Sequence, residues 1–204
     1  MKASTDPMTP AAAIRLLADL GASPRLVRHH ELVLEAATLL CDRARRDLGL
    51  AFDREQVLVG AAIHDAGKIL HPEEMREHGR RHELAGERLL VEHGVSASIA
   101  RFCVTHVSWD QPDAAIEDLL VALADTLWKG KRDNDLEGRV VDVIAHDAKR
   151  EAGRCSTRST RSARRSRPTG RRGSSARSRE LRDRGLRWTR MAKPKTVNYA
   201  RHNG

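Results

Sequence analysis

Ile63-His64-Asp65-Ala66-Gly67-Lys68 brings an imidazole, a carboxylate and an ammonium group close together in the sequence. Imidazole nitrogens and carboxylate oxygens are the donors that bind borderline and hard divalent cations, and Lys68 could neutralise an anion beside them. A His-Asp pair is nevertheless common by chance and often only ends a solvated helix. It indicates a site only if other donor side chains point toward it.

The chain through residue 151 is predicted to be all-α. Apolar residues recur there at helical spacing, and no convincing alternating strand is present. Thr9-Pro10 and Ser23-Pro24 each supply an N-cap followed by a first-turn proline, and Asp53 with Gln56 resembles a capping box. The predicted helices cover about residues 10–20, 24–49, 53–65, 81–93, 96–106, 112–129 and 136–149. A loop or short helix is expected over residues 71–80, and one domain over residues 9–151.

Several polar side chains fall on the apolar faces of these helices. His29 precedes apolar residues by four and eight positions and is expected to face inward, whereas His30, about 100° further round, is expected to face outward. His82, His106 and Asp125 also lie on inward faces. A single inward histidine is usually a hydrogen-bonded core residue, but an unpaired buried carboxylate is costly. Their joint burial therefore favours a shared divalent metal ion.

In this order the residues resemble the HD-domain superfamily of metal-dependent phosphohydrolases. The residues that carry the resemblance are His29, His64-Asp65, Gly67-Lys68, His82, His106 and Asp125, over about residues 10–150. Members of that superfamily are all-α bundles that hydrolyse phosphate mono- or diesters of nucleotides and related compounds. The resemblance therefore implies an HD-domain helical bundle and a hydrolase with a small phosphorylated substrate.

The resemblance also implies roles for individual residues. The first metal ion would be held by His29, His64, Asp65 and Asp125. His82 and His106 would complete a second site bridged by Asp65, as in two-metal members, or would contact substrate phosphate or merely pack, as in one-metal members. Asp65 and Lys68 are expected to be catalytic, and Lys68 and Arg81 to bind substrate, although solvated surface cations have the same appearance in sequence. Mn, Mg, Zn and Fe all stay open, as one ion or two.

Charge divides the chain into two different parts. Through residue 151 there are 20 Lys and Arg against 26 Asp and Glu, whereas residues 152–204 hold 17 against 2. The net charge of +9 therefore belongs to an Arg/Ser-rich tail that has too few apolar residues to fold and is predicted to be disordered. Such a tail is the only feature that suggests nucleic-acid binding.

The remaining composition indicates the environment of the protein. The three cysteines form no CxxC motif, and no run approaches the roughly 20 apolar residues of a membrane span. A cytoplasmic protein without a membrane partner is expected, with no indication of its oligomeric state. Two alternative functions remain: an HD-type di-iron oxygenase, and a non-catalytic regulatory or nucleic-acid-binding protein that acts through its tail.

We predict that the basic tail is a frameshifted end of the domain. Residues 153–174 can be back-translated with permitted codons that, read one nucleotide earlier, give WEVFDALDALCEEIAADGPARL, an acidic amphipathic helix like those before it. Sequencing the gene tests this prediction. An open shifted frame with helical apolar spacing is expected, and stop codons or polar nonsense in that frame would contradict it.

Overall fold

The computed structural model describes residues 8–159, and the side chains of 147–159 are not part of that description. The described residues form α-helices and short 3-10 helices without a strand, which confirms the predicted all-α class. The elements are α1 (Pro10–Asp19), α2 (Pro24–Leu48), α3 (Arg54–Ile63), η1 (Ala66–Ile69), η2 (Pro72–Met75), α4 (Arg81–Glu92), α5 (Ala97–Ala100), α6 (Phe102–Thr105), α7 (Ile116–Trp128) and α8 (Asn134–Ser159).

The predicted helix starts follow from side-chain caps that the structure contains. Thr9 accepts a hydrogen bond from the backbone N–H of Ala12, and Ser23 accepts one from Leu26. The α2 helix ends at Gly49, which has φ of 64°, a left-handed conformation that glycine adopts without steric cost. Local sequence therefore decides where the first two helices begin and where α2 ends.

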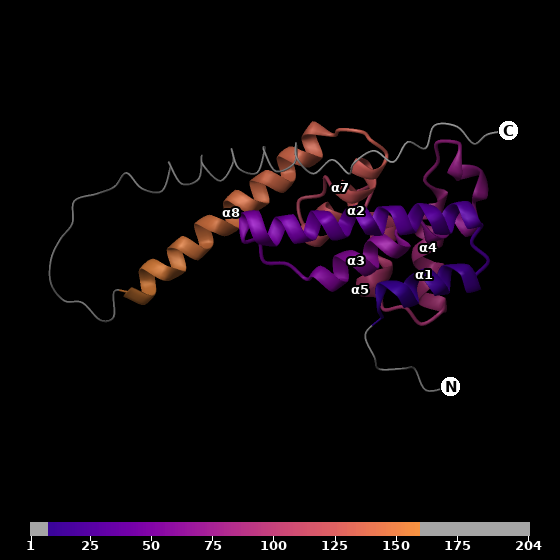
Figure 1. The fold of residues 1–204 in the computed structure, drawn as a ribbon, viewed down its shortest axis with the longest axis horizontal. Coiled ribbons are helices and arrows are strands. Elements are labelled where there is room, and N and C mark those ends of the chain that lie inside the picture. Colours follow the sequence, from indigo (N-terminus) through magenta and orange to yellow (C-terminus); the bar gives the residue numbers. More distant parts are fainter. Residues whose placement is uncertain (1–7, 160–204) are drawn as a thin grey trace.

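Helix α3 lies at the centre of the bundle and is buried from Val57 to Ile63. One side of it packs in a core with α2, α7 and α8, and the other packs in a second core with α1, α4 and the α5–α6 segment. Figure 1 shows α2 crossing the bundle beside α3, with α1 and α4 nearby. An apolar helix buried on both sides has a fixed position, so its C-terminal end is a rigid place for functional side chains.

Two predicted helices differ from the observed ones. The expected helix over residues 96–106 is divided into α5 and α6 at Arg101, although Arg101 keeps helical dihedral angles and Thr105 N–H still donates to its carbonyl at 2.9 Å. The last helix continues to Ser159, about ten residues beyond its predicted end, and its C-terminal half extends away from the bundle (Figure 1). From residue 160 onward, the predicted tail lies outside the described residues.

No helix within residues 8–159 combines the length and the apolar character that crossing a membrane requires.

Gly67 brings the 3-10 helix η1 against α4. A Cβ atom on Gly67 would lie 1.9 Å from the carbonyl oxygen of His82 and 2.6 Å from the backbone nitrogen of Gly86. Gly67 does not have positive φ, so its role is close backbone approach. This approach sets the distance between Asp65 and His82.

We expect Gly67→Ala to lower the free energy of unfolding by about 1–3 kcal/mol, because the added methyl group meets backbone atoms that cannot turn aside. Chemical denaturation of the full chain measures the loss. Gly138→Ala is the matched control, since nothing lies within 4 Å of its added Cβ and alanine is the better helix former by about 1 kcal/mol. Equal midpoints for the two variants would contradict the close approach.

Candidate metal centre

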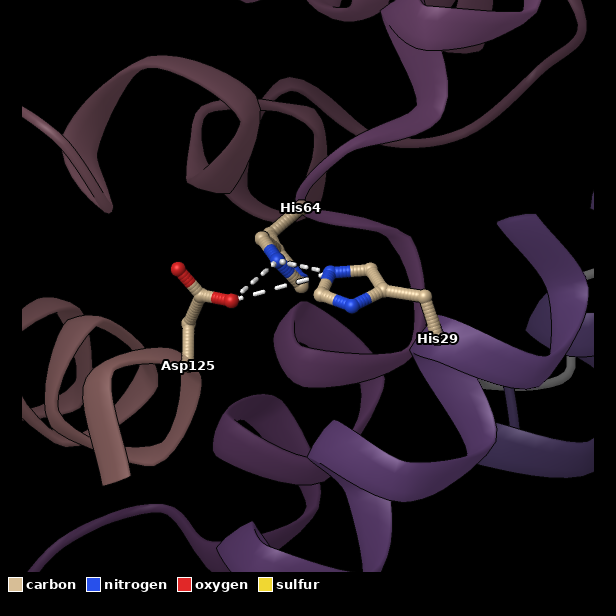
Figure 2. Close-up of side chains that lie close together, drawn as sticks. All are labelled: His29, His64 and Asp125. Atoms are coloured by element: carbon tan, nitrogen blue, oxygen red, sulfur yellow. Dashed lines mark hydrogen bonds and ion pairs between the residues drawn. The ribbon is translucent and has the colours of Figure 1, made fainter. Parts of the chain in front are cut away.

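Five helical elements deliver the histidines and aspartates to one buried place. His29 lies in the second turn of α2, and His64 and Asp65 directly follow the last residue of α3. His82 is the second residue of α4, His106 follows α6, and Asp125 lies near the end of α7. His64 and Asp65 are 0% and 1% exposed. His82, His106 and Asp125 are also buried, and the side chain of His29 is 11% exposed. Figure 2 shows the side chains of His29, His64 and Asp125 directed toward one another.

Asp65 lies between two pairs of histidines. Its Oδ2 atom is 3.2 Å from His29 Nε2 and 3.5 Å from His64 Nε2. Its Oδ1 atom is 3.2 Å from His82 Nε2 and 3.6 Å from His106 Nε2. The two oxygens of one carboxylate therefore face different imidazole pairs.

Asp125 completes the group around the first pair. Its Oδ1 atom is 3.6 Å from His29 Nε2 and 3.5 Å from His64 Nε2. Two sets of donors each lie within 4.8 Å of one another, namely His29 with His64 and Asp125, and His64 with Asp65 and His106. Donor atoms this close on separate helices can share one small cation.

In their neutral form, three of the four histidines present an unprotonated nitrogen to the centre. Nδ1 of His64 lies 3.0 Å from the carbonyl oxygen of Ala61, and Nδ1 of His106 lies 2.9 Å from that of Phe102. A carbonyl oxygen only accepts, so each Nδ1 donates and each neutral ring keeps a lone pair on Nε2. His82 has the same tautomer because its Nδ1 donates to a carboxylate, as described next.

Glu74, in η2, orients His82. Its Oε2 atom accepts from His82 Nδ1 at 2.6 Å and from the His82 backbone N–H at 3.1 Å, and its Oε1 atom accepts from the Arg81 backbone at 3.3 Å. Burial acts to raise the pKa of Glu74, but these hydrogen bonds lower it to about 2. The sequence did not single out Glu74, because its distance of eight residues from His82 spans a loop and has no helical period.

His29 has the opposite tautomer. Trp128 Nε1 lies 2.8 Å from His29 Nδ1, and an indole N–H can only donate, so Nδ1 accepts. The proton of the neutral ring is then on Nε2, which faces Asp65. To bind a cation through Nε2, a neutral His29 must change tautomer, which ends the Trp128 hydrogen bond. Trp128 is therefore part of the site.

The buried polar atoms of the centre lack enough protein partners. Asp65 Oδ1, His82 Nε2 and Asp125 Oδ1 are buried without a hydrogen bond within the described part of the chain. Burial by itself raises the pKa of Asp65, but the neighbouring imidazoles, His64 foremost, hold it well below its usual range. Burial and His64 lower the pKa of His106 to about 4, so that its imidazole is neutral at pH 7. Ionised carboxylates and neutral imidazoles are the form that a divalent cation binds, and the residues fit such an ion.

Two lysines each pair with one of the two carboxylates of the centre. Lys68 Nζ is 2.6 Å from Asp65 Oδ2, and Lys129 Nζ is 2.5 Å from Asp125 Oδ2. Both lysines line a cavity of about 500 Å³ that reaches His29. The remaining residues that line it are Arg25, Arg28, Leu32, Met75 and Trp128. Among the described residues, the lining of the cavity thus has four cationic side chains besides His29 and no acidic one.

The structure does not bring Arg81 to this cavity. Its guanidinium group is paired with Glu73 and with Glu74, and its side chain is 66% exposed. Arg81 is the first residue of α4 and directly precedes His82, but its side chain is paired with the acidic residues of η2. The structure therefore gives no support to its predicted contact with substrate.

The prediction that His30 faces outward is wrong. His30 is 0% exposed, and its ring centroid lies 5.0 Å from that of His64. Both α3 and α7 pack against α2, so the buried face of α2 is wide enough to include two successive residues. His29 is the one whose Nε2 reaches Asp65, and His30 Nε2 has no hydrogen-bond partner in the described residues.

One comparison with known proteins identifies a family. A family model described as HD domain matches residues 26–144, a range that includes all of the predicted ligands. No curated protein and no solved structure matches the chain.

We expect Glu74→Gln to weaken divalent-metal binding about 10- to 100-fold, because an amide cannot accept hydrogen bonds on both of its terminal atoms and His82 loses its fixed orientation. Calorimetric titration with Mn²⁺ measures the change. Glu73→Gln is the control, since within the described part of the chain this neighbouring carboxylate forms ion pairs with exposed Arg81 and partly exposed His71 and none with His82. Equal affinities in both variants would contradict the orienting role.

Proposed function

The chain belongs to the HD-domain family, and from that premise we propose that it is a metal-dependent phosphohydrolase that acts on a nucleotide or another small phosphate ester. The observation that carries the proposal is the position of Asp65, whose two oxygens face separate histidine pairs beside a cationic cavity. We assign this activity to the domain predicted over residues 9–151. A cytoplasmic location and a role for the basic tail stay predictions.

The residues that would hold a first ion are His29, His64, Asp65 and Asp125, and His82 with His106 would hold a second one together with Asp65. A bound divalent ion supplies Lewis-acid catalysis and activates water at neutral pH. Three of the imidazoles are already in the tautomer that this binding needs. The protein therefore provides orientation before any ligand arrives.

Lys68 has the position of a phosphate-binding residue. Lys68 lines the cavity and its ammonium group is bound to Asp65 Oδ2, so the residue connects the cavity with the centre. A phosphoryl oxygen that enters here accepts a charge-assisted hydrogen bond from Lys68, and negative charge that develops on it is stabilised. The apolar faces of Trp128, Met75 and Leu32 are available to the organic part of the substrate and exclude water from it.

We expect Asp65→Ala to remove metal binding and to lower phosphatase activity by at least about 10³-fold, because this carboxylate serves both histidine pairs. Metal content, followed by phosphate release from a panel of nucleotides, measures both losses. Asp19→Asn, an exposed carboxylate at the end of α1, is the control.

Activity that survives Asp65→Ala would contradict the assignment of the site. The metal measurement also tests the di-iron oxygenase alternative, because His82 and His106 with Asp65 suit iron as well. Two iron ions with a redox-dependent spectrum, and no phosphate release, would favour that alternative.

A further inference from the structure

One face of α2 forms a wall of the cavity. Arg25, Arg28, His29 and Leu32 have the spacing i, i+3, i+4 and i+7, and all four line the cavity. Arg25 lies four residues before His29, which is about 6 Å along the helix axis at 1.5 Å per residue. The wall therefore leads from the histidine centre past Arg28, which directly precedes His29, to Arg25 about one helical turn away.

The cations of the cavity differ in how far they are neutralised. Lys68 and Lys129 are bound to the carboxylates of the centre. Arg28 is paired with Glu31 at 2.8 Å and more distantly with Glu35, although its side chain stays 46% exposed. For Arg25 no ion pair is formed within the described range 8–159, and no acidic residue lines the cavity. The positive charge around Arg25 is thus available to a ligand.

We propose that the cavity selects substrates with two phosphate groups, one at the histidine centre and a second bound by Arg25 and Arg28. This inference rests on the proposed phosphohydrolase function and narrows its substrate class. A volume of about 500 Å³ exceeds what one phosphate fills and lies within the usual range for small-molecule sites. The guanidinium fork matches phosphate oxygens in a bidentate manner, so arginine recognises such a group better than a point charge does.

The kinetic test compares substrates that differ only in the second phosphate. Adenosine 5′-monophosphate, adenosine 5′-diphosphate and adenosine 3′,5′-bisphosphate are hydrolysed by the full chain with its metal and by Arg25→Ala. We expect the substitution to raise KM for a two-phosphate substrate about tenfold more than for the monophosphate, the effect of one lost charge-assisted hydrogen bond. If KM rises for adenosine 5′-diphosphate, the site accepts directly linked phosphates. If KM rises for adenosine 3′,5′-bisphosphate, it accepts phosphates separated by the sugar.

Matched variants separate recognition from general charge. Arg46→Ala removes an exposed arginine from the other end of the same helix and should leave the ratio of KM values unchanged. Arg25→Lys should restore part of the preference, because it keeps the charge but not the fork. Equal changes in KM for all three substrates in Arg25→Ala would overturn the inference while leaving the phosphohydrolase proposal intact.

A binding measurement tests the inference if no substrate is hydrolysed. Inorganic pyrophosphate and orthophosphate are titrated calorimetrically into the full chain without added metal. Pyrophosphate should bind more tightly than orthophosphate, and Arg25→Ala should lower the ratio of the two affinities about tenfold. Pyrophosphate that binds no more tightly than orthophosphate, or equally well to the variant, overturns the inference.

Discussion

The burial of two carboxylates among four imidazoles is the constraint on which the rest of the structure depends. Removing an ionised carboxylate from water costs several kcal/mol, and the protein offsets only part of this for Asp65 and Asp125. Each has one lysine on its Oδ2 atom, whereas each Oδ1 atom is buried without a hydrogen bond among the described residues. A divalent cation would supply the missing interaction, so metal binding and the stability of the bundle are expected to be coupled.

Backbone packing holds the two halves of this centre at a fixed separation. Asp65 follows the buried helix α3, and the contact of Gly67 with the backbone of α4 brings His82 to the other oxygen of the same carboxylate. Glu74 then binds the start of α4 and the ring of His82 together. The position of the second histidine pair is therefore determined by a loop and a glycine contact as much as by the ligands themselves.

Helical periodicity predicted most of the fold and the inward direction of the donor residues, because one apolar face per helix is a local property of sequence. It failed at His30, whose burial depends on two other helices that cover a wide face of α2. It also could not reveal Glu74, Trp128 or the cavity cations other than Lys68. Trp128 meets His29 across 99 residues, and a contact between distant segments leaves no period in the sequence.

The last turn of α7 connects the histidine centre to the cavity lined by Lys68, Trp128 and Lys129. Asp125 faces His29 and His64, Trp128 donates to His29, and Lys129 is bound to Asp125 while lining the cavity. A cation on His29 would require the tautomer that the Trp128 hydrogen bond excludes, so the indole N–H would lose this partner. Because Trp128 also lines the cavity, occupation of the centre by a cation would be linked to the shape of that cavity through one residue.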